Sequence, residues 1–473
     1  MWQKAVIAGL VFIIATGCRS PKTVCHSPRK CEPCFDQAVT AVDRTLVTFE
    51  SGSIEEYVQI GLERNPQIIA SQHKIDAIRH RIPQALSLPD PMVSTNTHLA
   101  PVQTAAGEQA FSLGVSQKFT NANRRATRSA IVAEEVSAAE SLLAQTRLEI
   151  AEDIRTACYQ LLFIRKSIEI TIEDRETLGQ ISEVVLRQYE VKKSVTQQDV
   201  LNVQAEQSKL ENQLTELRQK DRSFQARLAR LLHIDPNSSL EIVDRLSSTF
   251  KSFDVDALIA EAVAVRPDLQ SRLADIRRDR KKVCLAQLEG KPDFTVGVNW
   301  IATSSNGISP IANGDDALLL GIGFNLPVYK SRIRAGICEA QSNRFASESR
   351  YSGLQAQAAE EVFDIVSRLD ATRDTLSLVQ EDILPKAERT LDLSFEEYAT
   401  DSIQYIQLIS NWRSVLRYRI AEANLQSQYQ QLLASLARSI GQIGPLMEPE
   451  SIVQPAFAGD RIDEQGAEAN RDQ

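Results

Sequence analysis

The sequence has no excess of positive charge, few histidines and no recognisable catalytic motif. Its net charge is −9 and its pI is near 5.4, which argues against the basic footprint that nucleic-acid binding requires. The five histidines are scattered, and His73 and His80, which share a helix face, have no cysteine or acidic motif beside them to complete a metal site. Glycine-rich phosphate loops, nucleophile elbows and HExxH helices are absent. The sequence therefore predicts no enzyme activity, no cofactor and no metal site in these helices.

Glycine and proline are also scarce, with 19 and 17 residues in a chain of 473. They are concentrated in a few places, so long uninterrupted helices remain where two or three globular domains would be usual. Apolar residues alternate steps of four and three, which is the seam of a coiled coil. The seams are Ile150, Ile154, Ala157, Leu161, Ile164 and Ile168, and Ala358, Val362, Ile365, Leu369, Thr372 and Leu376. A helix over about 124–190 would be ~100 Å long, which requires a long hairpin packed against similar helices.

The N-terminus carries an export signal. Lys4 precedes an apolar run from Ala5 to Thr16, and Gly17 and Cys18 follow. The run is too short to span a bilayer and is typical of a signal peptide, here residues 1–17. Cys18 resembles the acylated cysteine of bacterial lipoproteins, which predicts a lipid anchor followed by an extended tether over 18–53. The alternative is an ordinary secretory cleavage that leaves Cys18 free.

The other cysteines form two groups. Cys25, Cys31 and Cys34 lie close together near the N-terminus, with a spacing that fits either a disulfide or a thiolate metal site. An oxidising compartment favours the disulfide. Cys158, Cys284 and Cys338 stand alone at helical positions, where we expect small buried hydrophobic residues.

Four short segments alternate apolar and polar residues with period two. They cover about 91–99, 111–119, 293–302 and 317–326. Successive side chains of a strand point to opposite faces, so each segment has an apolar and a polar side. Their length matches the ~9–11 residues that a tilted strand needs to cross a bilayer. The first segment carries the weakest pattern.

The chain is an internal duplication. Asn65-Pro66 matches Arg266-Pro267, Leu113-Gly114-Val115 matches Leu320-Gly321-Ile322, and Leu228-Ala229-Arg230 matches Leu436-Ala437-Arg438. The offset grows from 201 to 208 along the chain, as it does when loops take up insertions. The sequence divides into repeat 1 over 54–233, an equatorial linker over 234–255, repeat 2 over 256–441 and a disordered tail over 442–473.

Four strands cannot close a barrel. Unpaired backbone groups at a sheet edge cannot face lipid, so the chain must associate with copies of itself if the strands span a membrane. Two copies would give eight strands and an interior filled by side chains. Three copies would give twelve strands around an aqueous lumen, which favours a trimer if transport is the task.

These features resemble the TolC-type outer-membrane efflux proteins over roughly 54–441. The resemblance implies a mainly helical fold with a transmembrane β part, closed as a homotrimer with a 12-stranded β-barrel on a periplasmic α-helical barrel. It also implies an outer-membrane location and two partners, a periplasmic adaptor and an inner-membrane pump. The blocks Leu88–Met92 and Gly114–Phe119 resemble the subgroup that serves heavy-metal-cation pumps.

The same resemblance places two helical hairpin tips at about 191–199 and 400–408, facing the adaptor. Relatives commonly carry aspartates at the second tip, where this chain has Gln407 and Ser410. The candidate contact residues are Lys192, Lys193, Thr196, Asp199, Asp401, Gln404 and Gln407. Asp199 has a second interpretation, because a carboxylate in the first turn of a helix is favourable without any partner.

Two other functions remain open from the sequence. One is a lipid-anchored periplasmic coiled-coil adaptor or scaffold that never crosses the membrane. The other is the outer-membrane duct of a type I protein secretion system. An adaptor has no need of four amphipathic segments of spanning length, so the strands favour a passive exit duct. The transported substrate and the identity of the pump are not encoded in these patterns.

Overall fold

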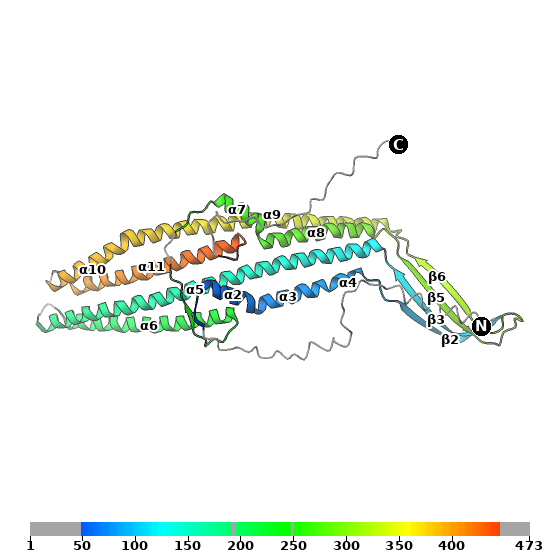
Figure 1. The fold of residues 1–473 in the computed structure, drawn as a ribbon, viewed down its shortest axis with the longest axis horizontal. Helices are drawn as coiled ribbons and strands as arrows, with labels where there is room; N and C mark the ends of the chain where they lie inside the picture. Colours follow the sequence, from blue (N-terminus) through cyan, green and yellow to red (C-terminus); the bar gives the residue numbers. More distant parts are fainter. Residues whose placement is uncertain (1–48, 192–194, 247–249, 401, 445–473) are drawn as a thin grey trace, which may run out of the picture. The chain divides into compact units, whose positions relative to one another are not determined.

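The computed structural model describes residues 49–191, 195–246, 250–400 and 402–444, which form a mainly helical fold with a small antiparallel sheet (Figure 1). The first half contains β1 (Phe49–Gly52), α2 (Ile54–Arg64), α3 (Pro66–Arg79), α4 (Arg81–Leu86), β2 (Met92–Thr104), β3 (Gly107–Phe119), α5 (Ala122–Val191) and α6 (Gln197–Leu232). The second half contains β4 (Leu240–Ile242), α7 (Val255–Val265), α8 (Pro267–Leu288), β5 (Phe294–Thr303), β6 (Ala317–Phe324), α9 (Lys330–Leu378), η2 (Val379–Ile383), α10 (Leu384–Ala399) and α11 (Tyr405–Ser439).

The elements recur in the same order in the two halves. The 11-residue α2 corresponds to the 11-residue α7, and the 36-residue α6 corresponds to the 35-residue α11. The 70-residue α5 is matched by α9, η2 and α10, which follow one another without a break. Caps explain where several helices begin: Ser53 and Glu56 form a capping box at α2, and the Asn65 side chain accepts from the backbone N–H of Gln67 at α3.

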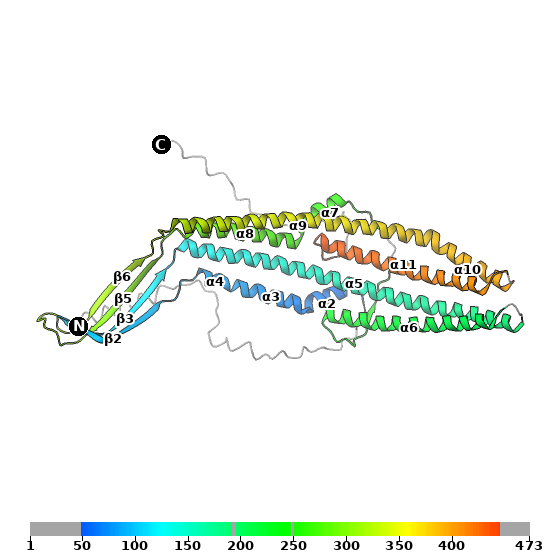
Figure 2. The same ribbon diagram turned by 180° about the vertical axis from the view of Figure 1, so that it is seen from behind.

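The helices pack along the heptad seams. Ile150, Ile154, Ala157 and Leu161 of α5 are buried, and so are their counterparts Ala358, Val362, Ile365 and Leu369 of α9. Near the sheet, α8 packs against both α5 and α9, while α3 and α4 pack against α5. Toward the hairpin tips the order of neighbours is α6, α5, α11, and then α9 with η2 and α10 (Figures 1 and 2).

The second long helix contains one irregular turn. Residues Val379–Ile383 form a π-helical segment, two residues before Pro385. Proline has no backbone N–H, and its ring clashes with the carbonyl of the preceding turn. π turns are rare, and this one lies in the turn before Pro385, after which the helix continues as α10. No proline occurs within α5, which runs through without interruption.

The sheet has the strand order β2-β3-β5-β6, with antiparallel neighbours throughout. β2 continues to Thr104 and β3 begins at Gly107, so the first hairpin extends beyond the apolar alternation that marks its strands in the sequence. Backbone pairing of Val102 with Gln109 and of Thr104 with Gly107 explains the extension. Gly107 has φ 138, and a Cβ there would lie 1.7 Å from the carbonyl oxygen of Ser304, so the turn requires glycine.

A second small sheet joins the end of the expected tether to the expected linker. β1 pairs in parallel with β4, with Phe49 opposite Leu240 and Gly52 opposite Ile242. Tyr57 donates from its hydroxyl to the backbone carbonyl of Glu241 at 2.7 Å. Residues 240–242 of the expected linker therefore form a strand that pairs with the residues that precede α2.

The expectation that all three helical cysteines are buried is wrong for two of them. Cys158 is fully buried, and burial raises the pKa of its thiol to about 12. Cys284 in α8 and Cys338 in α9 are exposed. In α8 the buried position is the neighbouring Val283, so Cys284 is turned away from the packed side of its helix.

Candidate functional site

The four-stranded sheet has one continuous apolar face. Residues paired across antiparallel strands point to the same side, and one paired row is Val93, Val115, Val298 and Leu320. The next row is Thr95, Leu113, Trp300 and Leu318. Val93, Leu318 and Leu320 are more than half exposed in the single chain. This face is apolar and uncovered.

Aromatic side chains lie at both ends of the apolar face. Phe119, Phe294 and Phe324 are paired beside the long helices. Toward the other end, the rings of Phe111 and Trp300 meet edge to face with centroids 6.2 Å apart. Outer-membrane barrels have aromatic girdles at both boundaries of their apolar band.

The opposite face of the sheet carries mainly small and polar residues, with Met92 and Leu319 on the outer strands as apolar exceptions. Its rows are Ser94, Gly114, Asn299 and Leu319, and Met92, Ser116, Gly297 and Gly321. A Cβ on Gly114 would lie 2.8 Å from Ser94 Oγ and 3.1 Å from Asn299 Oδ1, which shows that these side chains share one side. The sheet is thus amphipathic, as the four alternating segments predict.

The two hairpin tips pack on one another through buried side chains. Val195 before α6, Tyr398 at the end of α10 and Tyr405 at the start of α11 belong to one hydrophobic cluster. Gln188 Nε2 donates to the backbone carbonyl of Tyr398 at 3.0 Å. No pattern in the sequence marks this contact, because the residues come from different hairpins.

Asp199 caps α6. Its carboxylate accepts from Thr196 N at 2.9 Å and from Thr196 Oγ1 at 2.8 Å, while Asp199 N donates to Thr196 Oγ1 at 3.3 Å. The second interpretation of Asp199, in which its carboxylate stabilises the first turn of the helix without any partner protein, is therefore observed in the single chain. Thr196 is exposed and Asp199 partly so.

The second tip has no comparable cap. Gln404 precedes α11 without a capping hydrogen bond from its side chain, and Gln407 Nε2 donates to Asn411 Oδ1 at 3.2 Å. Both glutamines are exposed. Lys192, Lys193 and Asp401 lie outside the described residues, as do Cys18 and the cysteine group at 25–34.

One ion pair links the two hairpins beyond the tips. Arg413 of α11 lies 2.7 Å from Glu206 of α6, and Lys209 lies 2.6 Å from the same carboxylate. Burial acts to raise the pKa of Glu206, but hydrogen bonds from Arg413 and Lys209 outweigh it and hold the pKa below its ordinary value. These residues line a shallow groove with Trp412 and Leu416.

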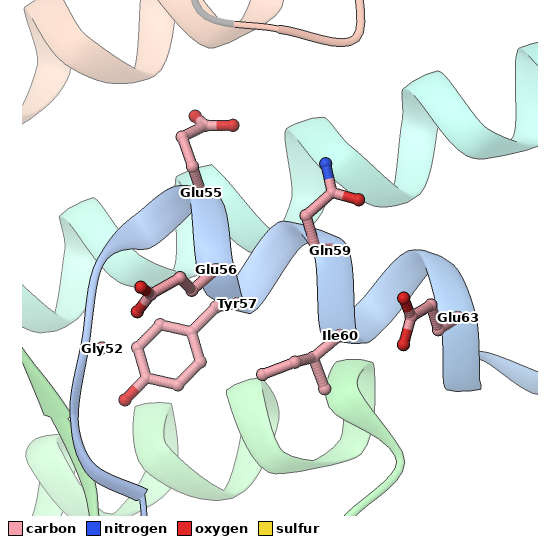
Figure 3. A pocket seen from close by; sticks show the side chains of 7 residues that line it. All are labelled: Gly52, Glu55, Glu56, Tyr57, Gln59, Ile60 and Glu63. Atoms are coloured by element: carbon pink, nitrogen blue, oxygen red, sulfur yellow. The ribbon is translucent and has the colours of Figure 1, made fainter.

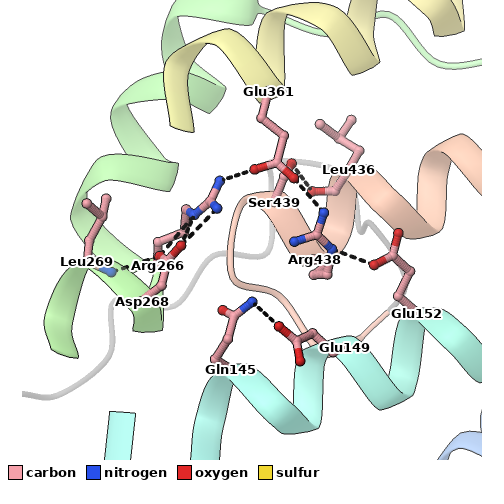
Figure 4. Close-up of polar contacts among 10 residues, drawn as sticks. All are labelled: Gln145, Glu149, Glu152, Arg266, Asp268, Leu269, Glu361, Leu436, Arg438 and Ser439. Atoms are coloured by element: carbon pink, nitrogen blue, oxygen red, sulfur yellow. Dashed lines mark hydrogen bonds and ion pairs between the residues drawn. The ribbon is translucent and has the colours of Figure 1, made fainter. Parts of the chain in front are cut away.

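A cluster of charges joins the two halves where α8 begins and α11 ends (Figure 4). Arg438 of α11 contacts Glu152 of α5 and Glu361 of α9. Arg266 at the start of α8 lies 2.7 Å from Glu361 and 2.9 Å from Asp268. Burial would raise the pKa of Glu361, yet the hydrogen bond from Arg266 and the charges of Arg438 and Arg266 lower it. We call Glu152, Arg266, Asp268, Glu361 and Arg438 the Arg438 cluster.

A hollow lies on the surface of α2, and two of its carboxylates have partners within the chain. It is lined by residues of α2 and the turn before it (Figure 3): Gly52, Glu55, Glu56, Tyr57, Gln59, Ile60 and Glu63. Glu55 forms a two-point pair with Arg155 at 2.9 and 2.8 Å, and Glu56 completes the capping box. These two carboxylates therefore have structural roles.

None of the helices described combines the length and the apolar composition that a bilayer-spanning helix needs. Within the same residues, no group of three or more histidine, cysteine or acidic side chains is arranged to hold a metal ion.

The sequence and the fold are similar to those of known proteins. Residues 258–442 match the family described as outer membrane efflux protein. No curated protein sequence matches the chain. The outer membrane protein VceC from Vibrio cholerae is 18% identical with a TM-score of 0.67, and the match covers 82% of this chain and 96% of VceC.

Two further solved structures have the same fold. CusC, whose structures address transmembrane channel formation, is 16% identical with a TM-score of 0.68 over 82% of this chain and 92% of CusC. The Campylobacter jejuni outer membrane channel CmeC is 15% identical with a TM-score of 0.65 over 82% and 85%. The resemblance to TolC-type outer-membrane proteins drawn from the sequence is confirmed.

Proposed function

We propose that this chain, whose residues 258–442 match the outer membrane efflux proteins and whose fold is that of solved outer-membrane channels, is the exit duct of an efflux system. The observation that carries the proposal is the amphipathic sheet at the ends of the long helices. Its apolar face suits lipid and its small polar face suits a water-filled lumen. The duct does no chemistry, so the energy for export comes from an inner-membrane pump.

The open edges of the sheet require copies of the chain. β2 and β6 are the outer strands of the sheet, and their unpaired backbone groups cannot face lipid. Three copies give twelve strands with an aqueous lumen, whereas two give a barrel whose interior side chains fill it. The proposed assembly is a homotrimer with a 12-stranded barrel in the outer membrane and the helices in the periplasm.

The hairpin tips are the proposed docking site for a periplasmic adaptor. They lie at the opposite ends of the long helices from the sheet (Figure 1), and Thr196, Gln404 and Gln407 are exposed there. Lys192, Lys193, Asp199 and Asp401 complete the proposed contact. Heavy-metal cations are the proposed cargo, on the resemblance of Leu88–Met92 to the subgroup that exports them.

Cys18 is the proposed lipid anchor, with residues 1–17 removed as a signal peptide. Replacing Cys18 with alanine should abolish metabolic labelling with palmitate and leave an unprocessed precursor. The sheet should still insert, because a single acyl chain contributes little next to buried strands. Labelling that persists in the Cys18→Ala protein would place the acylated residue elsewhere.

The decisive test separates a duct from a membrane-anchored scaffold. The protein is extracted from outer membranes in mild detergent, its mass is measured by light scattering, and its conductance is measured in planar bilayers. A duct gives a trimer whose mobility in gel electrophoresis changes on heating, and this trimer opens discrete channels in the bilayer. A scaffold held only by its lipid gives neither result. Export of a labelled protein through the same assembly would instead support a secretion duct.

A further inference from the structure

The two halves of the chain are equivalent residue by residue along their long helices. Ile150, Ile154, Ala157 and Leu161 of α5 are buried, and adding 208 to each number gives the buried residues Ala358, Val362, Ile365 and Leu369 of α9. The same offset relates Leu228 and Ala229 of α6 to Leu436 and Ala437 of α11, again all buried. The correspondence therefore extends to the direction of each side chain on its helix.

One contact between the two halves of a chain joins a pair of helices whose counterparts in the opposite halves do not pack against each other. α11 packs against α5, and Arg438 of α11 contacts Glu152 of α5. The equivalent helices are α6 and α9, which lie at opposite ends of the order α6, α5, α11, α9. Their equivalent residues are Arg230 and Glu360. Both are exposed, and within the described residues neither forms an ion pair.

The surroundings of these two residues are complementary in charge. Arg227 lies one turn from Arg230 on α6, whereas Asp364 lies one turn from Glu360 on α9. Between them on α9, Phe363 is 60% exposed. A large exposed ring is typical of a protein contact surface. Glu360 beside it has no ion-pair partner among the described residues, whereas Asp364 pairs with Arg368 on its own helix at 3.1 Å.

The junction of sheet and helices shows the same arrangement. Arg124 at the start of α5 is buried and bonds both carboxylate oxygens of Asp293, which precedes β5, at 3.1 and 3.0 Å. The equivalent residues are Arg332 at the start of α9 and Asp90 before β2. Both are exposed and form no ion pair in the part of the chain that is described.

We propose that neighbouring copies meet by repeating the contact between the halves: Arg230 of one copy pairs with Glu360 of the next, and Asp90 of one with Arg332 of the next. The inference rests on the proposed assembly of several copies and assigns its interface. In this arrangement β6 of one copy pairs with β2 of another, so the open sheet edges and the unpaired helices are covered together. The two ion pairs lie roughly 40 Å apart along α9, at 1.5 Å per residue.

The interface is tested by crosslinking in full-length protein. Cys25, Cys31, Cys34, Cys284 and Cys338 are replaced by serine, while the buried Cys158 and the proposed anchor Cys18 are kept. Into this background go Arg230→Cys with Glu360→Cys, or separately Asp90→Cys with Arg332→Cys. Outer membranes are treated with a short bis-maleimide, because an arginine–glutamate pair spans more than a disulfide can.

Each double variant should give denatured bands at two and three chain masses. We expect roughly tenfold more crosslinked product than with either single cysteine, because a neighbouring thiol has an effective concentration in the millimolar range. The matched control is Arg438→Cys with Glu152→Cys, which should consume both thiols within one chain and leave its mass unchanged.

Two results would overturn the inference. If light scattering shows a trimer but either double variant gives only monomeric bands, the copies do not repeat the contact between the halves, and the proposed duct still stands. If light scattering shows only monomers, the proposed assembly and this interface both fail.

Discussion

Single residues illustrate what the periodic pattern of the sequence shows and what it hides. Leu161 is fully buried on the predicted seam of α5. Asp174 is also buried, 2% exposed, although nothing in the sequence distinguishes it from the solvated carboxylates of the same helix. Burial dominates over the nearby charge of Arg419 and raises the pKa of Asp174 to about 6. A buried carboxylate depends on neighbours from another hairpin, which one helix's pattern does not encode.

Replacing Asp174 with asparagine should stabilise the protein at alkaline pH. The pKa is raised in the folded state, so the stability that this carboxyl provides is complete below about pH 4, its unfolded pKa. It is lost as the pH rises through about 6. At pH 8 asparagine removes the cost of burying a charge, a gain on the order of 2 kcal/mol.

Thermal unfolding followed by circular dichroism at pH 8 and at pH 4 measures this effect. The Asp174→Asn protein should melt higher than the parent at pH 8 and like the parent at pH 4. Asp221, which pairs with Arg165 at 3.3 Å, supplies the control, since Asp221→Asn should bring no gain at pH 8. Equal melting of parent and Asp174→Asn protein at pH 8 would contradict the predicted cost.

Whole elements are where the sequence was most informative. The four-and-three spacing predicts the long helices, and period-two alternation predicts the strands, because each element buries one face. The pattern failed where hydrogen bonds rather than burial determine the structure. The ladder of β2 continues through Val102 to Thr104 without apolar alternation, and the pairing of β1 with β4 involves only a few residues.

The tips could be located from the sequence but not described in detail. The resemblance to the TolC-type proteins placed them near 191–199 and 400–408. Their shared core of Val195, Tyr398 and Tyr405 could not be predicted, because contacts between separate hairpins leave no periodic trace in either one. The cap formed by Thr196 and Asp199 could be predicted as an alternative, since a capping box is a local motif.

Charge changes at the tips should separate docking from folding. Lys193→Glu or Gln407→Glu is expected to reduce export of the pump's substrate while leaving the trimer yield unchanged. Gln407 is exposed, lysine is a residue type that is seldom buried, and surface substitutions change stability little. Leu161→Glu is the folding control, since it buries an unpaired charge on the seam and should abolish trimers. Growth under the toxic substrate and trimer yield are measured together. Unimpaired export by both tip variants would remove the tips from the proposed adaptor contact.

Asp199 needs a separate comparison, because it caps α6. Asp199→Asn keeps an acceptor for Thr196 N and removes only the charge, whereas Asp199→Ala also removes that hydrogen bond of the capping box, at a cost of ~1 kcal/mol. The hydrogen bond from Asp199 N to the N-cap residue Thr196 remains in both proteins. Export that falls equally in both proteins would assign the effect to the charge. A loss confined to Asp199→Ala would leave Asp199 with its structural role alone.

At the scale of the whole molecule, a single chain leaves strand edges unpaired and apolar surface exposed. The sheet has two open edges, and one of its faces is apolar and exposed, with Leu318, Leu320 and Ile322 each more than half uncovered. The sequence could predict that a lone chain cannot span a membrane, since that follows from hydrogen-bond closure. It could not identify the residues proposed to join the copies. The packing order of the helices is needed to see which of the equivalent surfaces remain uncovered in a single chain.

Opposite substitutions at two neighbouring residues of β5 test the whole arrangement. Val298 lies in the apolar row with Val115 and Leu320, while Asn299 lies in the polar row with Gly114 and Leu319. If the apolar face meets lipid, Val298→Arg places a charge in the bilayer at a cost of ~2–4 kcal/mol per chain. It should therefore strongly reduce the trimer recovered from outer membranes. Asn299→Arg adds the same side chain toward the lumen, so the trimer should form while a ring of positive charge shifts the channel's preference toward anions.

Trimer yield and reversal potential in planar bilayers are compared for the two proteins. Assembly lost in Asn299→Arg and retained in Val298→Arg would mean that the faces are reversed, and equal assembly and conductance in both would mean that this sheet does not line a membrane pore.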